Sequence, residues 1–326
     1  MQPFAYANPA TVQEAVALLA PRWGEADVLA GGTDLLCLLK DEIHAPKRVV
    51  NIKSIKDLAG IQKTADATLR IGALVTFEEL ASHADIKKEY PALSAAAAGV
   101  ASPQVRNIGT AGGDLCQRPR CWYFRSGFGL LAVKDGTPLV VAGENKYHAI
   151  FGGGPAYFVS ASSLGPALVA LGARVKLVSA KGAREVPVAK FFVAPEKEGQ
   201  REIAMAPNEI LTEILVPPAA SRNATYEIRE REYLDWPLVT ASVALTMKGA
   251  VVGSARVVLG HVAPTPWSAT AAGKFLSGKR VTAEVAEEAG KLAVADARPL
   301  SQNAYIVQLA KVAVKRALLE AVKARA

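Results

Sequence analysis

The chain has 326 residues, of which 51% are hydrophobic and 21% are charged, as is typical of a globular protein and not of a disordered or fibrous one. Its 38 Lys and Arg residues exceed its 30 Asp and Glu residues, but the excess is spread along the sequence without a basic block. Nucleic acid is therefore not a predicted partner. The apolar stretches are far shorter than the ~20 residues of a membrane-spanning helix, so no membrane span is expected.

The chain has three cysteines, Cys37, Cys116 and Cys121. This number is small and odd, which argues against a disulfide framework. They indicate a reducing compartment. The first residues also lack the basic and apolar regions of a secretory signal. We therefore expect a cytoplasmic protein.

Local patterns predict alternating helices and strands in the first 80 residues. Thr11 with Glu14, and Thr76 with Glu79, form capping-box patterns, and each predicts the start of a helix. Strands are expected at residues 27–30, 48–52 and 69–74. This alternation is typical of an α+β or α/β protein.

The rest of the chain continues this pattern after a segment of different character. Residues 91–125 read as an Ala-rich helix, a loop dense in Asn, Gly and Thr, and a cluster of Cys, Arg and aromatic residues. Pro217 and Pro218, within residues 216–221, predict a domain boundary. The remaining expected elements are strands at 157–160, 174–178, 242–247 and 255–260, and helices at 282–297 and 303–323.

Two glycine-rich loops carry the chemistry. In Gly31–Asp34, which follows a predicted strand, two glycines permit a positive φ and close approach of a ligand to backbone N–H groups. In Val105–Leu115, three glycines, a Thr and an Asn repeat this pattern, and Asp114 is suited to bind the hydroxyls of a ribose or ribityl chain. Together the loops indicate a phosphorylated cofactor held from two sides; as single motifs, both are also compatible with simple turns.

Longer motifs carry a resemblance to a known family. Leu29–Leu36, Ile71–Thr76, Asn107–Arg125 and His261–Trp267 resemble the FAD-binding medium subunit of molybdenum hydroxylases of the xanthine dehydrogenase family. The run Cys116–Arg125 is most similar to the bacterial aldehyde oxidoreductase branch. The resemblance extends from about residue 3 to residue 319 in unbroken order.

The resemblance implies an α+β fold. Residues 1–218 would form an FAD-binding domain of the vanillyl-alcohol-oxidase type, with α+β subdomains at about 1–55 and 56–218. Residues 222–326 would form a C-terminal α+β domain of the CO dehydrogenase flavoprotein type.

The implied function is electron transfer. The chain would carry FAD and pass electrons from the [2Fe–2S] clusters of a small partner subunit to NAD, a quinone, ferredoxin or dioxygen. A large partner subunit with the molybdopterin cofactor would oxidise the substrate, an aldehyde. No catalytic residue is assigned in this chain, and export with a partner that carries a signal would place the complex in the periplasm.

The resemblance also implies which residues contact FAD. The first loop would hold the pyrophosphate, the second would lie along the pyrophosphate, ribityl chain and flavin, and Leu164 would lie near the adenosine end. The implied set is Leu29, Ala30, Gly31, Gly32, Thr33, Asp34, Leu35, Thr76, Ala101, Ser102, Arg106, Asn107, Gly109, Thr110, Gly113, Asp114 and Leu164.

The sequence departs from the resemblance at an iron–sulfur motif. Relatives of the aldehyde oxidoreductase branch carry two further cysteines after the pair that matches Cys116 and Cys121, and four thiolates ligate a [4Fe–4S] cluster. Here the corresponding positions fall near Leu130 and Pro138. We therefore predict no metal site and no such cluster in this chain, and interpret Cys116 and Cys121 as a remnant.

Several features have two interpretations. Many relatives have Asp where this chain has Ser163. Relatives also often have Lys near the positions of Glu227 and Ile228. Either Arg229 or Arg231 replaces the charge of this Lys, or the run 229–232 is a solvated strand face. The cluster Arg118–Arg125 suits a wall above the flavin, a docking surface or a loop held by aromatic packing. Residues 147–151 are either structural or close to the flavin.

Two other functions are compatible with the same fold. A stand-alone flavin oxidase would need a base over the flavin, and none can be nominated. A scaffold subunit that has lost flavin would have no reason to keep both glycine loops.

Overall fold

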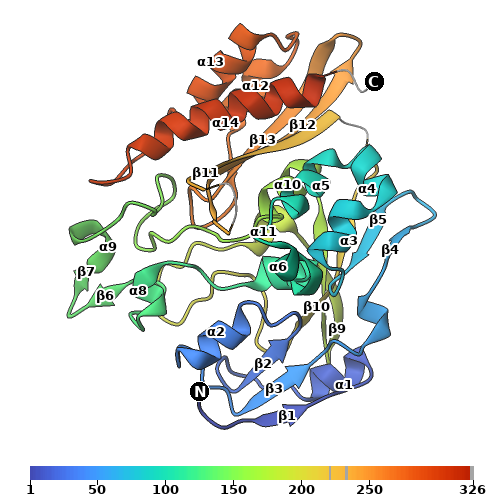
Figure 1. Ribbon diagram of the computed structural model, residues 1–326, viewed down its shortest axis with the longest axis vertical. Helices are drawn as coiled ribbons and strands as arrows, with labels where there is room; N and C mark the ends of the chain where they lie inside the picture. The colour runs from blue at the N-terminus through green and yellow to red at the C-terminus, as the bar shows by residue number, and fades with distance from the viewer. Residues whose placement is uncertain (220–221, 232–233, 324–326) are drawn as a thin grey trace.

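The computed structural model describes residues 1–219, 222–231 and 234–323. In these residues, three layers of sheet and helix follow one another in chain order, from the N-terminal end at the bottom of Figure 1 to the C-terminal helices at its top. The first sheet is parallel, in the order β1-β3-β2. Its strands are Ala5–Ala7 (β1), Ala26–Leu29 (β2) and Arg48–Asn51 (β3), with helices Val12–Ala17 (α1) and Leu35–Lys40 (α2).

The second sheet is antiparallel, in the order β4-β5-β10-β8-β9. The largest hydrophobic core lies between this sheet and its helices, and Tyr90, Leu93 and Phe191 are fully buried in it. The strands are Ile61–Lys63 (β4), Leu69–Gly72 (β5), Arg174–Ser179 (β8), Gly182–Pro187 (β9) and Ile210–Val216 (β10). The short helices of this layer are Lys56–Leu58 (η1), Phe77–Ser82 (α3), Ala84–Glu89 (α4), Pro91–Ala98 (α5), Pro103–Ile108 (α6), Ala111–Cys116 (α7), Gly165–Leu171 (α10) and Val188–Phe191 (α11).

The third sheet, β11-β12-β13-β14, is also antiparallel and is covered by long helices. Small residues of the last helix, including Ala310, Ala313 and Ala317, are fully buried, which lets this helix pack closely on the sheet. The elements are Arg222–Arg229 (β11), Pro237–Lys248 (β12), Val251–Gly260 (β13), Trp267–Ser268 (β14), Thr270–Leu276 (α12), Ala283–Ala293 (α13) and Tyr305–Val322 (α14).

A separate lobe extends from the second layer, at the left of Figure 1. It consists of helix Trp122–Arg125 (α8), the hairpin Val133–Lys134 (β6) and Thr137–Pro138 (β7), and helix Leu139–Ala142 (α9). Asn145 fastens the lobe to the third layer, because its Nδ2 donates to Ser301 Oγ at 3.0 Å and its Oδ1 accepts from Gln302 N at 2.9 Å.

Most predicted elements are present, and both predicted N-caps begin a helix: Thr11 Oγ1 accepts from Glu14 N, and Thr76 Oγ1 accepts from Glu79 N. The reciprocal bond of a capping box forms only at Thr76, whereas the Glu14 carboxylate accepts from Ala10 N. Two predictions were wrong. The region predicted as a loop contains α6 and α7, because Ser102 and Thr110 cap them and Pro103 is suited to a first turn. Residues 157–160 form no strand; Ser160 N donates to Ala263 O at 2.9 Å in an irregular segment.

The predicted boundary lies between the second and third layers. Pro217 and Pro218 follow β10 directly, whereas Ala220 and Ser221 lie outside the described residues. The layers are in contact across this point, since Asn223 Oδ1 accepts from Ala92 N at 2.9 Å. No helix among the described residues is long and apolar enough to cross a membrane.

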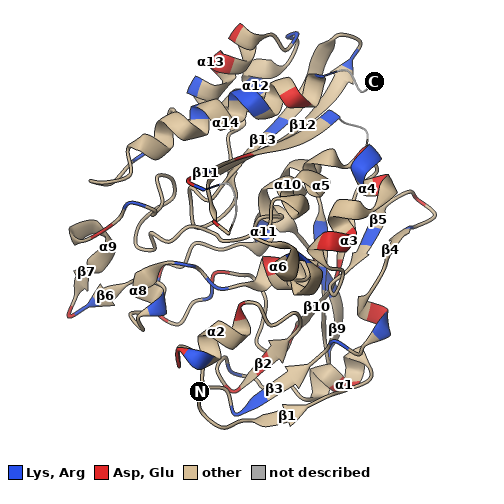
Figure 2. Ribbon diagram, viewed as in Figure 1, with Lys and Arg blue, Asp and Glu red and all other residues tan. Residues whose placement is uncertain are grey.

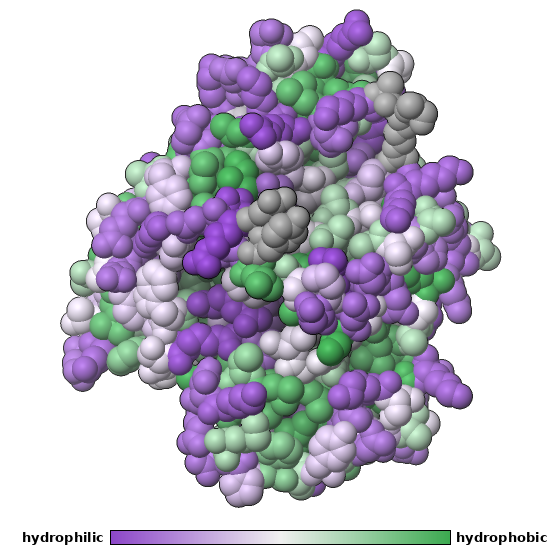
Figure 3. Space-filling view, viewed as in Figure 1, coloured by the Kyte–Doolittle hydropathy of each residue, from purple (hydrophilic) through white to green (hydrophobic). Residues whose placement is uncertain are grey.

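Charged residues are spread through the fold, whereas hydrophobic residues gather on one part of the visible face. Lys and Arg are distributed over all three layers and alternate with Asp and Glu (Figure 2). Hydrophobic residues gather on the lower part of this face, over α2 and the first sheet, where Leu36 is exposed (Figure 3).

Candidate functional site

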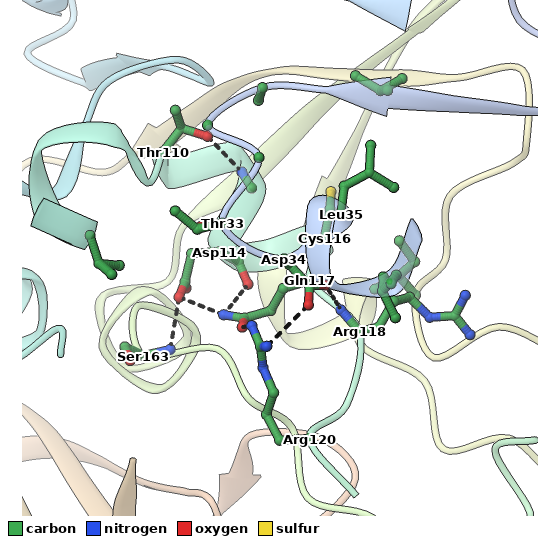
Figure 4. Close-up of a pocket in the computed structure, with 18 of the residues that line it drawn as sticks. Thr33, Asp34, Leu35, Thr110, Asp114, Cys116, Gln117, Arg118, Arg120 and Ser163 are labelled. Atoms are coloured by element: carbon green, nitrogen blue, oxygen red, sulfur yellow. Dashed lines mark hydrogen bonds and ion pairs between the residues drawn. The ribbon is translucent and has the colours of Figure 1, made fainter. Parts of the chain in front are cut away.

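A cavity of about 280 Å³ opens between the first sheet and the helices of the second layer (Figure 4). Both glycine loops line it, together with residues between 99 and 105, between 116 and 120 and between 234 and 237. All three layers therefore contribute to one site. We call it the main cavity.

The first glycine loop reaches the main cavity directly after β2. Gly32 has a φ of +78°, which favours glycine. A Cβ on Gly31 would lie 2.2 Å from the carbonyl oxygen of Ile108, so only glycine allows the two loops to touch here. Within the described residues, the N–H groups of Gly31, Gly32, Thr33 and Asp34 donate no hydrogen bond. They are available to an anion.

The second glycine loop uses its N–H groups within the protein. Thr110 Oγ1 accepts from Gly113 N at 3.2 Å, while Ala111 N and Gly112 N donate to Val75 O and Ala73 O at 2.8 and 2.9 Å. Thr110 and Gly113 line the cavity. This loop therefore forms a wall of the cavity, and the free donors come from the first loop.

The carboxylate of Asp114 is fully hydrogen-bonded by other groups of the protein. Its carboxylate accepts from Ser162 Oγ at 2.5 Å, Ser163 N at 3.1 Å, Leu164 N at 3.0 Å and Gln117 Nε2 at 3.0 Å. Burial raises the pKa of Asp114 to about 6, although these hydrogen bonds and the charge of an arginine act in the opposite direction. The residue thus holds the segment 162–164 against the cavity, as Figure 4 shows for Ser163.

Asp34 connects the first loop to the Arg-rich segment. Its Oδ2 accepts from the backbone N of Arg118 at 2.8 Å, and its Oδ1 accepts from Arg125 Nη2 at 2.7 Å. Arg120 Nη1 lies 3.2 Å from the same Oδ1. The Asp34 carboxylate therefore binds three arginines, of which Arg118 and Arg120 line the cavity (Figure 4).

A network of polar side chains at one end of the cavity was not predicted from the sequence. Arg118 Nη1 lies 2.9 Å from His44 Nε2, and His44 Nδ1 lies 3.0 Å from Asp27 Oδ2. Because a guanidinium only donates, His44 carries its proton on Nδ1 and donates it to Asp27. Arg118 Nε also lies 2.5 Å from Glu202 Oε1. These residues are far apart in the sequence, so no motif predicts that they meet.

The third layer adds another buried arginine. Arg229 lines the main cavity, pairs with Glu227 and donates to the carbonyl oxygen of Gly99. The side chains of Arg229 and Glu227 are 14% and 11% exposed, so this part of the run is not a solvated strand face. Arg231 is exposed, and Glu232 lies outside the described residues.

The aromatic cluster is partly a packed loop. Phe124 is buried, with the Arg118 guanidinium 4.8 Å and the Arg125 guanidinium 5.9 Å from its ring centroid. Arg120 instead lies over the Trp236 ring, at 4.7 Å, and lines the cavity. Farther along the chain, residues 149–151 are buried in the protein core.

The structure gathers many of the residues implied by the resemblance, but not all of them. Those that line the main cavity are Ala30, Gly31, Gly32, Thr33, Asp34, Leu35, Ala101, Thr110, Gly113 and Asp114. Those that do not are Leu29, Thr76, Ser102, Arg106, Asn107, Gly109 and Leu164. Thr76 and Ser102 cap helices, Arg106 pairs with Glu78, and Leu164 is in the core. Cavity residues that were not predicted include Trp23, His44, Arg201, Met205 and Trp236.

The two cysteines after the second loop do not form a suitable donor set for a cluster. A [4Fe–4S] cluster requires four ligands, normally thiolates, and Cys116 and Cys121 supply two. Leu130 and Pro138 supply no further sulfur. In the described part of the chain, no group of three or more His, Cys, Asp or Glu residues is arranged to hold a metal ion.

Comparison with known proteins identifies the family. The family described as the FAD-binding domain in molybdopterin dehydrogenase matches residues 2–219, and the CO dehydrogenase flavoprotein C-terminal domain matches residues 224–321. The chain belongs to the FAD-binding subunits of the molybdenum hydroxylases. It is therefore an oxidoreductase subunit, and FAD is its cofactor.

Relatives match this FAD subunit along nearly its whole length. The aldehyde oxidoreductase FAD-binding subunit PaoB of Escherichia coli K12 is 32% identical over 98% of this chain and 99% of its own length. The carbon monoxide dehydrogenase medium chain of Hydrogenophaga pseudoflava is 31% identical over 97% and 96%.

Solved structures agree with the fold. Quinoline 2-oxidoreductase from Pseudomonas putida 86 has a TM-score of 0.77 at 26% identity, over 98% of this chain and 96% of its own. Carbon monoxide dehydrogenase from Hydrogenophaga pseudoflava has a TM-score of 0.77 at 29% identity, over 98% of both chains. The α+β fold with an FAD-binding part and a C-terminal CO dehydrogenase flavoprotein part is confirmed.

Proposed function

We propose that this FAD subunit transfers electrons within a heterotrimeric molybdenum hydroxylase that oxidises an aldehyde. A large subunit with the molybdopterin cofactor and a small subunit with [2Fe–2S] clusters would be its partners, and NAD, a quinone, ferredoxin or dioxygen would be the final acceptor. The relation to an aldehyde oxidoreductase subunit supports this substrate class.

The observation that carries the proposal is the contact between the two glycine loops. The close approach of Gly31 to Ile108 brings the free N–H groups of the first loop beside the wall formed by Thr110 and Gly113. Free N–H groups suit a pyrophosphate. The residues present therefore fit FAD.

Each part of the main cavity has a role in this proposal. The first loop would hold the pyrophosphate, Thr110 and Gly113 would contact the cofactor chain, and Asp34 and Asp114 would hold the surrounding segments in place. When bound, FAD supplies both one-electron and two-electron chemistry, which links iron–sulfur carriers to a two-electron acceptor. Residues 29, 76, 102, 106, 107, 109 and 164 stay predicted contacts that a rearrangement on binding would have to supply.

The proposal includes the domain division and the location. We place the FAD-binding domain at residues 1–218, with subdomains at about 1–55 and 56–218, and the C-terminal domain at residues 222–326. The two family matches meet near this boundary. Three unpaired cysteines favour the cytoplasm, with the periplasm as the alternative for export with a partner.

The first test is an absorption spectrum of the purified chain, with chromatography of the acid-released cofactor and iron analysis. We expect the bands of oxidised flavin, released FAD and negligible iron. A colourless protein would overturn the cofactor assignment in favour of a scaffold subunit. A brown protein that contains iron would overturn the interpretation of Cys116 and Cys121.

A reduction experiment separates electron transfer from a stand-alone oxidase. We expect dithionite to bleach the flavin bands under argon, and we expect a panel of aldehydes to leave the isolated chain oxidised. Direct bleaching by an aldehyde would favour the oxidase, since this chain would then act on the organic substrate by itself.

A further inference from the structure

A second cavity, of about 260 Å³, lies beside the main cavity. We call it the aromatic cavity. Arg120, Asp235, Trp236 and Pro237 line both cavities, so these residues form a shared wall. The other lining residues lie in or near the lobe, in the segment between 159 and 161, in the third sheet and its loops, and in α14. A molecule in the aromatic cavity would be separated from the main cavity by this wall.

The walls of the aromatic cavity are flat and held in position. The rings of Trp122 and Tyr147 meet edge to face at 5.9 Å and 74°. The Tyr147 hydroxyl donates to Glu230 Oε2 at 2.9 Å, and the Arg120 guanidinium covers the Trp236 ring. Aromatic walls of this kind suit a flat ring, because offset stacking and edge contacts both favour one.

The polar groups of the aromatic cavity favour a ligand that accepts hydrogen bonds. Its carboxylates are occupied: Glu230 accepts from Tyr147, and Asp235 accepts from the backbone N of Arg231 at 3.2 Å and of Trp236 at 2.9 Å. One buried donor is not occupied, because Arg120 Nε has no hydrogen-bond partner among the described residues.

A histidine adds another unpartnered polar atom. His148 Nε2 lies 3.2 Å from Cys121 Sγ. Burial lowers the pKa of His148 to about 4 and raises that of Cys121, so both are neutral at pH 7. His148 Nδ1 has no partner among the described residues, and it can donate to a ligand in the tautomer that carries the ring proton on this atom.

The lining of the aromatic cavity does not suit a dinucleotide, because none of its described lining residues is a glycine. The aromatic cavity therefore lacks the kind of glycine loop that the main cavity offers a pyrophosphate. A small planar molecule with carbonyl oxygens and no donors of its own matches the walls and the free donors.

We propose that the aromatic cavity binds a quinone, which serves as the electron acceptor of this subunit. This inference rests on the proposed electron-transfer function. In the reaction, the quinone gains two electrons and two protons, and both carbonyl groups become hydroxyls. The reduced cofactor loses the same two electrons and two protons, so no other reactant is needed.

The test uses the FAD-loaded chain and duroquinone. This probe has a fully substituted ring and does not add to thiols, so it leaves Cys121 unmodified. Calorimetric titration measures its affinity. Alkylation by N-ethylmaleimide, followed by mass spectrometry of each cysteine peptide, locates it. We expect saturable binding and about tenfold slower alkylation of Cys121 with no change at the exposed Cys37.

Two alanine variants supply the comparison. Trp122→Ala removes a wall of the aromatic cavity, and we expect it to weaken duroquinone binding at least about tenfold. Tyr6→Ala, on the remote strand β1, also removes an exposed aromatic ring, and we expect no change in binding. The flavin content and thermal melting of both variants show that each is folded and loaded.

Three outcomes would overturn the inference. These are an FAD-loaded chain that gives no binding heat with duroquinone, binding that Trp122→Ala does not weaken, and protection of Cys121 by NAD instead of duroquinone. A chain without FAD would overturn the proposed function itself, so the two failures are distinguishable.

Discussion

The Asp34 carboxylate accepts a hydrogen bond from the backbone N–H of Arg118 at 2.8 Å, across 84 residues of sequence. This contact brings the Arg-rich segment to the first glycine loop. The same carboxylate pairs with the guanidinium groups of Arg120 and Arg125, so one charge holds two cations and the backbone of a third arginine. The arginines around the main cavity therefore depend on a residue of the glycine loop.

Asp34→Asn should loosen this arrangement. The amide keeps the shape but loses the charge that pairs with Arg120 and Arg125, and one of its polar atoms can no longer accept a hydrogen bond. We expect a loss of about 2–4 kcal/mol in the free energy of unfolding and about tenfold weaker FAD binding. Urea denaturation and FAD dissociation measure the two effects. Asp41→Asn, at the exposed end of the same helix, is the control and should change neither.

Gly31→Ala should separate the two glycine loops. The added Cβ would lie 2.2 Å from a backbone oxygen of Ile108, so one of the loops must move. We expect the variant to be purified with far less than one FAD per chain, as measured by absorbance after release of the cofactor. Gly199→Ala, which has a positive φ but open space around it, should cost about 1 kcal/mol and keep its FAD. Equal FAD content in the two variants would contradict the role of the loop contact.

Because of Asp114, the free energy of unfolding should fall as the pH rises from about 4 to 6. Its pKa is raised from 3.8 to about 6 by burial, so within this window the folded chain holds a proton that the unfolded chain has released. The Asp114 contribution is therefore fully present below pH 4, and on the order of 2–3 kcal/mol is lost by pH 6.

Urea denaturation at several pH values measures this contribution. Asp114→Asn should abolish the Asp114 component of the slope, while Asp296→Asn, at an exposed position, should keep it. A wild-type slope that persists in Asp114→Asn would show that another group titrates.

The three cysteines should differ in reactivity. Burial raises the pKa of Cys116 to about 12 and also raises that of Cys121, so only a small fraction of each cysteine is a thiolate at pH 8. Cys37 is exposed. We expect Cys37 to be alkylated at least about tenfold faster than the other two, as followed by mass spectrometry. Rapid reaction of Cys116 or Cys121 would instead indicate thiolates and reopen the question of a metal.

Local sequence determined the parts of this protein that depend on neighbouring residues. The caps at Thr11 and Thr76 begin helices because donor and acceptor lie three residues apart. The first glycine loop could be predicted for the same reason, because the strand, the two glycines and the apolar run follow one another directly in the sequence. The helices at 103–116 were missed although Ser102 and Thr110 were visible as capping residues, because the density of glycine favoured a loop.

The tertiary structure decided which charges meet and which side chains serve the protein instead of a ligand. The chain Asp27, His44, Arg118 and Glu202 joins distant residues, and no spacing in the sequence marks it. Asp114 was readable as a cavity residue, but only folding shows that Ser162, Ser163 and Leu164 occupy its carboxylate. Burial, which shifts the pKa values of such groups, is a property of the packed layers, because it depends on contacts between segments that the sequence keeps far apart.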